Sequence, residues 1–418
     1  MSRSIFVKLG LIFVALLVVG GLLYQIPAIN SRLSWRLDVA MTYLRNVINP
    51  VGQMPTPLPQ PVAAVTSYPT ETPTDRPTVL APVDPSPELT PTQTPVPTPL
   101  PQAVDLGSPP WEKQTPNNCG PATLSLYLHT HNWEGNQTDI SDLLKPQTGD
   151  RNVNVEELIY YVRNHAGWLN AEFRVGGDIE LLKSFLAAGL PIMIEEGFLF
   201  EEPYWPNDDL WAGHYLLLTG YDEDTQTFIA QDTFLGPDRL VSYQSVADNW
   251  QAFNYAYIMV YRPDQEELVQ SLLGENWDVD FNRDRALELA ESETNLDPNN
   301  PYTWFNLGSN LIYFERYNEA AQAFDTARQI GLPQRMLRYQ FGPFFAYFFS
   351  GRNEDLLALT DYALQRTPNS EESLLWRGWG RYRAGETYKA IDDFNAALEE
   401  NPFYEDAKYA LEYVTANP

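Results

Sequence analysis

The N-terminal part of the chain contains one long apolar run, LGLIFVALLVVGGLLYQIPAI, at residues 9–29, and no charged residue interrupts it. Because a helix needs about 20 apolar residues to cross a bilayer, the run predicts a single transmembrane helix. Arg3 and Lys8 precede it and no clear small-residue cleavage site follows, which favours an uncleaved signal anchor over a cleaved signal peptide. Residues 1–8 would form a short tail, and residues 30–49 a juxtamembrane segment.

Periodic spacing of apolar residues disappears between residues 50 and 103, where Pro, Thr, Val and Ser dominate. Such a composition cannot bury enough apolar surface to offset the entropy lost on folding, so it predicts a disordered linker. Proline-rich chain favours an extended conformation of about 3.1 Å per residue, so we expect a stalk that holds the next domain away from the membrane. A ligand for SH3-type domains is the competing interpretation.

Helical and strand patterns both occur between residues 104 and 263. Apolar residues three and four apart predict helices, and short runs rich in β-branched and aromatic residues predict strands. Helices that precede a largely antiparallel sheet are typical of an α+β domain. We expect helices over 120–131, 154–166 and 178–188, and strands over 191–195, 214–220, 227–231 and 255–261.

From residue 264 to 418 the pattern becomes one helix after another, with similar units spaced by about 34 residues. This period resembles that of tetratricopeptide repeats and predicts an all-α solenoid that binds a protein or peptide partner. A middle unit around 335–368 keeps little of the pattern. The first full unit carries, at the offsets of the repeat, Trp304, Leu307, Gly308, Tyr317, Ala320, Phe324, Ala327 and Pro333.

Charge and composition narrow the classes of function. The formal net charge is −28, from 27 basic and 55 acidic residues, which argues against binding to nucleic acid or to anionic lipid head groups. One cysteine excludes a disulfide framework and a thiolate metal cluster. The four histidines lie at 129, 131, 165 and 214, without the spacing of metal ligands, so we expect neither a metal nor a cofactor.

That single cysteine, Cys119, stands in the stretch Asn-Asn-Cys-Gly-Pro-Ala-Thr, where a helix is expected to begin. Pro121 is favoured in the first turn of a helix, and the positive end of the helix dipole favours the nucleophilic thiolate. A small buried core cysteine at a helix start is the alternative interpretation. The choice between them depends on whether a histidine and a carboxylate lie nearby.

Candidates for those partners follow in the sequence. A cysteine hydrolase needs an imidazole, a group that orients it, and donors for the oxyanion. His214 heads an apolar strand, and Asp232 comes one predicted hairpin later, where antiparallel pairing would bring it close to His214. Gln114 lies five residues before Cys119, and its amide could serve as an oxyanion donor. Taken singly, His214 could be a strand-end histidine and Asp232 a turn residue.

Together these residues resemble the papain-like double-glycine peptidase family, known for trimming leader peptides from bacteriocins, and its free-standing relatives in bacterial surface proteins. The matching blocks are Gln114 with Cys119-Gly-Pro-Ala, Gly-His214-Tyr through Gly-Tyr-Asp, and Asp232-Thr. The resemblance implies that Cys119 is the nucleophile, His214 the general base and acid, Asp232 the orienting carboxylate and Gln114 the oxyanion donor. Asn118 replaces an aspartate common in the family, and no transporter domain follows in the sequence, so the substrate stays open.

An acidic and aromatic insertion, residues 195–211, precedes His214. A loop there would line the substrate cleft and recognise a basic or aromatic peptide, with Trp205, Trp211 and Tyr215 as the residues expected in the cleft. The alternative is a solvated surface loop.

The sequence therefore predicts a single-pass protein of the cell membrane, of prokaryotic surface type, with an α+β papain-like cysteine peptidase domain and a tetratricopeptide solenoid outside the cytoplasm. The expected activity is hydrolysis of peptide bonds by Cys119, His214 and Asp232, on a substrate or partner that the repeats recruit. Two other functions stay open: a peptide-binding receptor without catalysis, and an acyltransferase that uses the same three residues.

Overall fold

The structure, a computed structural model, describes residues 26–48, 50, 52–59, 99–146, 152–202 and 207–417, together with 14–15, 18–21 and 24. The predicted membrane-spanning run 9–29 falls largely outside these residues. No helix among the described residues is both long enough and apolar enough to cross a membrane. The N-terminal helix that is described, α2, covers Pro27–Ile48.

An antiparallel sheet forms the centre of the first domain, in the order β2-β7-β3-β4-β5-β6, with the short β1 on the edge of β4. The longest strand, β4, is buried over nearly its whole length because neighbouring strands cover its edges and helices cover its faces. The strands are β1 (Ala103–Asp105), β2 (Asn170–Arg174), β3 (Ile192–Leu199), β4 (Trp211–Asp222), β5 (Thr227–Asp232), β6 (Gly236–Ser242) and β7 (Tyr257–Tyr261).

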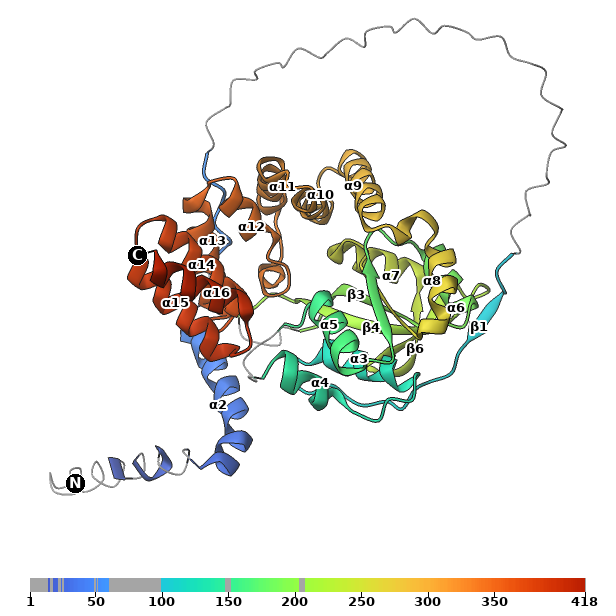
Figure 1. Cartoon of the computed structure of the whole chain (residues 1–418), viewed down its shortest axis with the longest axis horizontal. Coiled ribbons are helices and arrows are strands. Elements are labelled where there is room, and N and C mark those ends of the chain that lie inside the picture. Colours follow the sequence, from blue (N-terminus) through green and yellow to red (C-terminus); the bar gives the residue numbers. More distant parts are fainter. Residues whose placement is uncertain are drawn as a thin grey trace, which may run out of the picture.

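Helices cover both faces of this sheet (Figure 1). Successive side chains of a strand point to opposite faces, so Leu217 of β4 packs with α3 and α5, whereas Leu216 and Leu218 pack with α6. The predicted α+β domain with an antiparallel sheet is confirmed. Its helices are α3 (Cys119–His129), α4 (Gln137–Leu144), α5 (Val155–His165), α6 (Ile179–Ala187), α7 (Tyr243–Trp250) and α8 (Glu266–Leu273).

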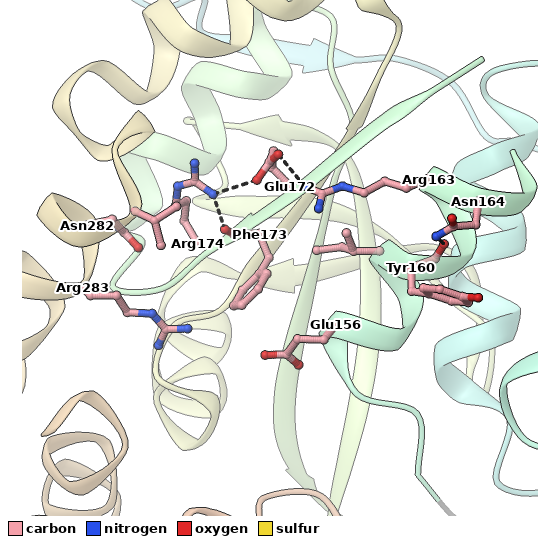
Figure 2. A pocket seen from close by; sticks show the side chains of 11 residues that line it. Glu156, Tyr160, Arg163, Asn164, Glu172, Phe173, Arg174, Asn282 and Arg283 are labelled. Atoms are coloured by element: carbon pink, nitrogen blue, oxygen red, sulfur yellow. Dashed lines mark hydrogen bonds and ion pairs between the residues drawn. The ribbon is translucent and has the colours of Figure 1, made fainter. Parts of the chain in front are cut away.

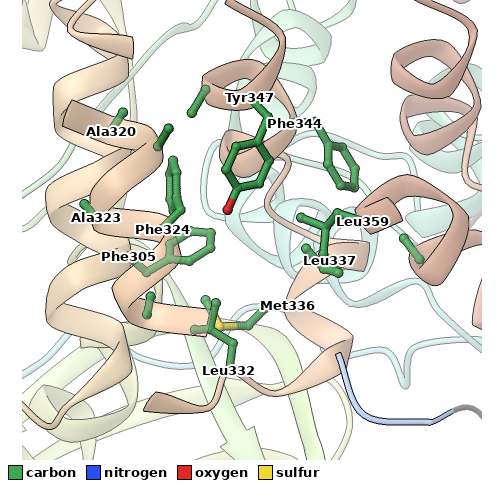
Figure 3. Close-up of a cluster of buried hydrophobic side chains, with 14 of the residues drawn as sticks. Phe305, Ala320, Ala323, Phe324, Leu332, Met336, Leu337, Phe344, Tyr347 and Leu359 are labelled. Atoms are coloured by element: carbon green, nitrogen blue, oxygen red, sulfur yellow. The ribbon is translucent and has the colours of Figure 1, made fainter. Parts of the chain in front are cut away.

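A run of paired helices follows, as the repeat period predicts. The small residues of the pattern lie where two helices cross: a Cβ atom on Gly308 would lie 2.8 Å from the ring of Phe324. Figure 3 shows the aromatic cluster that fills these crossings, with Phe305, Phe324 and Phe344 fully buried. The helices are α9 (Val279–Leu296), α10 (Pro301–Tyr313), α11 (Tyr317–Ile330), α12 (Gly342–Phe349), α13 (Asn353–Arg366), α14 (Glu371–Arg383), α15 (Thr387–Glu400) and α16 (Glu405–Ala416).

The expected disordered linker is fixed at both of its ends. Near its start, Met54 packs against the cluster of Figure 3, and the backbone of Pro55 and Leu58 is hydrogen-bonded to the repeats. Near its end, β1 pairs with β4. These two short segments are thus held by backbone hydrogen bonds to folded elements. Residues 60–98 lie outside the described residues.

Buried ion pairs join the first domain to the repeats. The Asp208 side chain, which has no exposed surface, lies 2.7 Å from Nη2 of Arg335 and 3.2 Å from Nη2 of Arg338. Both arginines belong to the short helix η4 (Gln334–Arg338), between α11 and α12. Asp208 lies just before β4, so this contact fixes the chain at the entrance to the strand that carries His214.

Candidate active site

Cys119 is the first residue of α3 and keeps part of its surface exposed. The turn before Cys119 requires a residue in the left-handed backbone conformation, and Asn117 adopts it with a φ of 58°. Asn118 is buried, and its amide nitrogen donates to Gln137 Oε1 at 2.9 Å, which anchors the turn. Gly120 is required for packing, because a Cβ atom there would lie 3.3 Å from the ring of Tyr215. The thiol is thus held at a helix N-terminus by local turn chemistry and by contact with β4.

His214 and Asp232 meet across the β4–β5 hairpin. Nε2 of His214 lies 2.9 Å from Oδ1 of Asp232, and both side chains are buried. The same carboxylate oxygen accepts hydrogen bonds from the backbone N–H groups of Phe234 at 2.8 Å and Leu235 at 3.0 Å. These bonds fix the carboxylate, which in turn fixes the orientation of the imidazole.

The imidazole of His214 also lies near Cys119, whose charge acts on it. Because Nε2 faces Asp232, Nδ1 is the ring nitrogen left for the thiol. Burial alone would lower the pKa of His214, but the hydrogen bond to Asp232 and the charges of Asp232 and Cys119 outweigh it and raise the pKa to about 10. The pKa of Asp232 is lowered, since bonds to His214 overcome its own burial. The arrangement favours a positively charged imidazole beside the sulfur atom.

Gln114 is placed to donate to an oxyanion. Its backbone N–H donates to Thr233 O at 2.9 Å, and its Oε1 accepts from Thr233 Oγ1, also at 2.9 Å. Its Nε2 amide has no hydrogen-bond partner among the described residues, so it can donate to a bound group. The backbone N–H of Cys119 is a second donor, because the first N–H groups of a helix lack partners within the helix.

Three further residues lie at this site that the sequence alone did not predict. Trp111 donates from Nε1 to the Asp232 carbonyl at 3.0 Å. Glu196 lies opposite His214 in the β3–β4 pairing, is buried, and has no hydrogen-bond partner for Oε2 in the described part of the chain. Burial raises the pKa of Glu196 to about 7. Two adjacent glutamates in an otherwise apolar strand were the available clue.

The third is Tyr339, which comes from the repeats. Its ring packs against Gly213, where a Cβ atom would lie 3.0 Å from Cδ1 of Tyr339. Burial raises the pKa of Tyr339, and the charge of Cys119 adds to that rise. The phenol therefore lies close enough to Cys119 for the two groups to interact electrostatically. The site is therefore built from both regions of the chain.

The residues expected in a substrate cleft do not share one surface. Trp205 lies outside the described residues. Trp211 is 3% exposed and stacks on Phe253 with ring centroids 5.8 Å apart. Tyr215 is 2% exposed and donates to the Val153 carbonyl at 3.1 Å. Both are packing residues, so the expectation that they line a cleft is not supported. Within the acidic insertion, Asp208 pairs with Arg335 and Arg338 of the same chain.

A pocket of about 310 Å³ lies elsewhere, between α5, β2 and α9 (Figure 2). Its charged residues are largely paired: Glu172 bonds to both Arg163 and Arg174. The rings of Phe173 and Tyr313 flank the guanidinium of Arg283 at 5.5 and 5.1 Å. Neither Cys119 nor His214 lines this pocket. Among the described residues, no group of His, Cys, Asp and Glu side chains could hold a metal ion.

Residues 106–258 match the Peptidase_C39 like family. The match includes Gln114, Cys119, His214 and Asp232 and ends before the repeats, so the chain contains a peptidase C39-like domain followed by a region of paired helices. No curated protein matches the chain.

Solved structures similar to parts of the chain fall into two groups. A protein described as a C39-like peptidase from Bacillus anthracis is 16% identical, with a TM-score of 0.31, and the alignment covers 38% of this chain and 98% of that one. Xylellain, a cysteine protease from Xylella fastidiosa, is 16% identical, with a TM-score of 0.30 and coverage of 39% and 87%. A TPR protein from Thermus thermophilus is 21% identical, with a TM-score of 0.28 and coverage of 32% and 74%.

Proposed function

We propose that the protein is a cysteine peptidase in which Cys119, His214 and Asp232 act together. The observation that carries the proposal is the 2.9 Å hydrogen bond from Asp232 to the imidazole of His214, with Cys119 near enough for its charge to raise the pKa of that imidazole. A buried carboxylate, an oriented imidazole and a thiol at a helix N-terminus are the groups that nucleophilic catalysis by cysteine requires.

The chemical steps follow from the geometry. The Cys119 thiolate attacks the carbonyl carbon of a peptide bond, and the oxyanion receives hydrogen bonds from Gln114 Nε2 and the Cys119 N–H. The His214 imidazolium gives its proton to the departing amine, which leaves a thioester on Cys119. Neutral His214 then takes a proton from water, whose oxygen attacks the thioester, and the acid is released with the thiolate restored. Asp232 keeps the imidazole oriented throughout.

A protein or peptide substrate fits this proposal best. The carbonyl and amine of a peptide bond supply the electrophile and leaving group that these residues act on, and the repeat region supplies Tyr339 beside the site. The apolar run at 9–29 supports a location at the cell membrane, and we propose that the folded regions lie outside the cytoplasm. Transfer of the acyl group to an amine in place of water is the outcome that would change the class of the enzyme.

A pool of synthetic peptides, incubated with the full chain and read by mass spectrometry, tests the proposal. Wild type should produce cleaved peptides, and Cys119→Ala should produce none while its thermal melt stays close to that of wild type. His214→Gln should behave as Cys119→Ala does. His165→Gln is the matched control, because His165 lies at the end of α5 against Tyr160 and Tyr161 and should keep full activity.

Three outcomes would contradict the proposal. Cleavage that survives Cys119→Ala would remove the thiol from the mechanism. A melt that collapses in Cys119→Ala would make the residue a core cysteine. Products that carry an added amine in place of water would identify an acyltransferase.

A further inference from the structure

The start of the proline-rich segment is bound to the repeats in a defined way. The backbone N–H of Leu58 donates to Oδ1 of Asp355 at 2.9 Å, and Nη2 of Arg328 donates to the Pro55 carbonyl. Met54 packs against the apolar cluster of the repeats. Arg328 belongs to α11 and Asp355 to α13, so the segment crosses the surface between these two helices.

With residues 54–58 in place, the two charged groups are buried and are also held by contacts within the repeats. Arg328 is 7% exposed and its Nη1 donates to Tyr347 Oη at 2.7 Å; Asp355 is 3% exposed and its Oδ2 lies 2.8 Å from Nη2 of Arg352. Buried and oriented charges bind backbone groups more strongly than mobile surface charges do, because little entropy is lost on binding. This surface is therefore built to hold the backbone of an extended chain.

The sequence of the bound segment suits that surface. Pro55, Pro57 and Pro59 have no N–H and restrict the backbone, so little entropy is lost when the segment is held extended. Between residues 55 and 59, only Thr56 and Leu58 have a backbone N–H that can donate, and it is Leu58 that donates to Asp355. The surface thus binds the backbone carbonyl of Pro55 and, three residues later, the backbone N–H of Leu58.

The same hexapeptide occurs twice in the chain. Pro-Thr-Pro-Leu-Pro-Gln stands at 55–60 and again at 97–102, directly before β1. The second copy meets the α+β domain: Tyr221 Oη donates to the Pro101 carbonyl at 2.8 Å, and the Glu223 N–H donates to the Gln102 carbonyl at 2.9 Å. The two copies are held through different backbone groups, so the second copy serves as an independent peptide with which to test the surface between α11 and α13.

We propose that the surface between α11 and α13 is a binding site for extended peptides of the type Pro-Thr-Pro-Leu-Pro, and that residues 54–58 of the same chain occupy it. A partner that uses this surface must present the same arrangement of backbone groups and must displace the internal segment. The proposal is independent of the chemistry at Cys119.

We test the proposal with two full-length variants, each of which lacks one backbone N–H of the bound segment. Leu58→Pro removes the donor to Asp355, whereas Thr56→Pro removes an N–H of the same segment that has no hydrogen bond among the described residues. The probe is a fluorescent synthetic peptide of residues 52–60, and its binding is measured by anisotropy. A tethered segment competes at about millimolar effective concentration, so wild type and Thr56→Pro should bind the probe weakly. Leu58→Pro should bind it about tenfold more tightly or better.

Variation of the probe avoids any effect on protein folding. A probe that carries proline in place of Leu58 should lose binding to the Leu58→Pro protein, and a probe of residues 96–102 should bind with an affinity similar to that of the first probe. Equal binding to all three proteins, no binding to the Leu58→Pro protein, or failure of the 96–102 probe would each overturn the proposal.

Discussion

The ring of Tyr339 packs directly on Gly213, the residue before His214, so that a Cβ atom on Gly213 would lie 3.0 Å from Cδ1 of Tyr339 and 2.8 Å from the Phe253 ring. Tyr339 belongs to the repeats and His214 to the proposed catalytic site. The position of the imidazole thus depends on how the repeats pack against β4, and the two regions act as one body.

Gly213→Ala tests this dependence. The added methyl group has no room, so either the Tyr339 ring or β4 must move, at a cost of about 1–3 kcal/mol. We expect a lower melting temperature and about tenfold slower alkylation of Cys119 by iodoacetamide. Gly167→Ala is the matched control, because a Cβ atom at Gly167 would meet no atom within 4 Å. Equal alkylation rates in the two variants would separate the repeats from the site.

Asp232→Asn tests the cause of the raised pKa of His214. The pKa of His214 in the folded protein is about 10, against 6.5 for an ordinary histidine, so its stabilising effect is full below pH 6.5 and is lost as the pH rises to about 10. In Asp232→Asn the pKa of His214 should fall, and the loss of stability above pH 6.5 should become shallower. Melting temperatures from pH 6 to 10 give the readout.

The matched control for this variant is Asp238→Asn, on the neighbouring strand, whose carboxylate accepts from Gln231 Nε2 at 2.8 Å. Asp238 lies near the same hairpin but does not contact His214. It should keep the wild-type pH dependence. A pH profile unchanged in Asp232→Asn would show that Asp232 does not hold the proton on His214.

Glu196→Gln should change stability at lower pH. Burial raises the pKa of Glu196 from 4.5 to about 7, so the unfolded chain ionises this group first and the folded protein loses stability as the pH rises from 4.5 to about 7. The amide variant lacks this ionisation, so its melting temperature should rise relative to wild type across that range. Glu201→Gln, at an exposed residue of the same insertion, should leave the melting temperature unchanged. Parallel curves for Glu196→Gln and wild type would refute the assignment.

Arg335→Met tests the buried ion pair between the two regions. Removal of one partner leaves Asp208 with a buried and less compensated charge, which costs about 3 kcal/mol. The double variant Arg335→Met with Asp208→Asn should recover part of this loss in a denaturant melt. Arg285→Met breaks an exposed pair with Glu288 and should change stability little. Additive losses in the double variant would argue against direct coupling.

Elements with strong periodicity could be predicted from the sequence. The amphipathic spacing of 154–166 and 178–188 corresponds to α5 and α6, and the apolar runs correspond to β3, β4, β5 and β7. The strands β2 and β6 carry few apolar residues, NAEFR and GPDRLVS, and form only because a neighbouring strand pairs with them. No local pattern identifies such strands.

Some residues of the candidate site could likewise be predicted from local sequence, and others could not. Cys119, His214 and Asp232 stand in recognisable local motifs, and hairpin pairing brings the last two together. Tyr339 and Glu196 could not be identified from the sequence. Tyr339 lies more than 120 residues after His214 and reaches the site only by packing against Gly213. Glu196 lies opposite His214 only because of the register between β3 and β4. The sequence of the acidic insertion predicts either a surface for a basic peptide or a solvated loop, and neither pattern shows that Asp208 pairs with Arg335.

The proline-rich segment is closed into a loop whose two ends are both bound to the folded body, at Leu58 and at β1. On the N-terminal side, Asn207 Nδ2 also donates to the Asn46 carbonyl of α2 at 2.9 Å. A single proteolytic cut between residues 60 and 98 would therefore leave two polypeptides that remain assembled. Release of the folded body from the N-terminal segment would require dissociation of the Leu58 contact as well as cleavage.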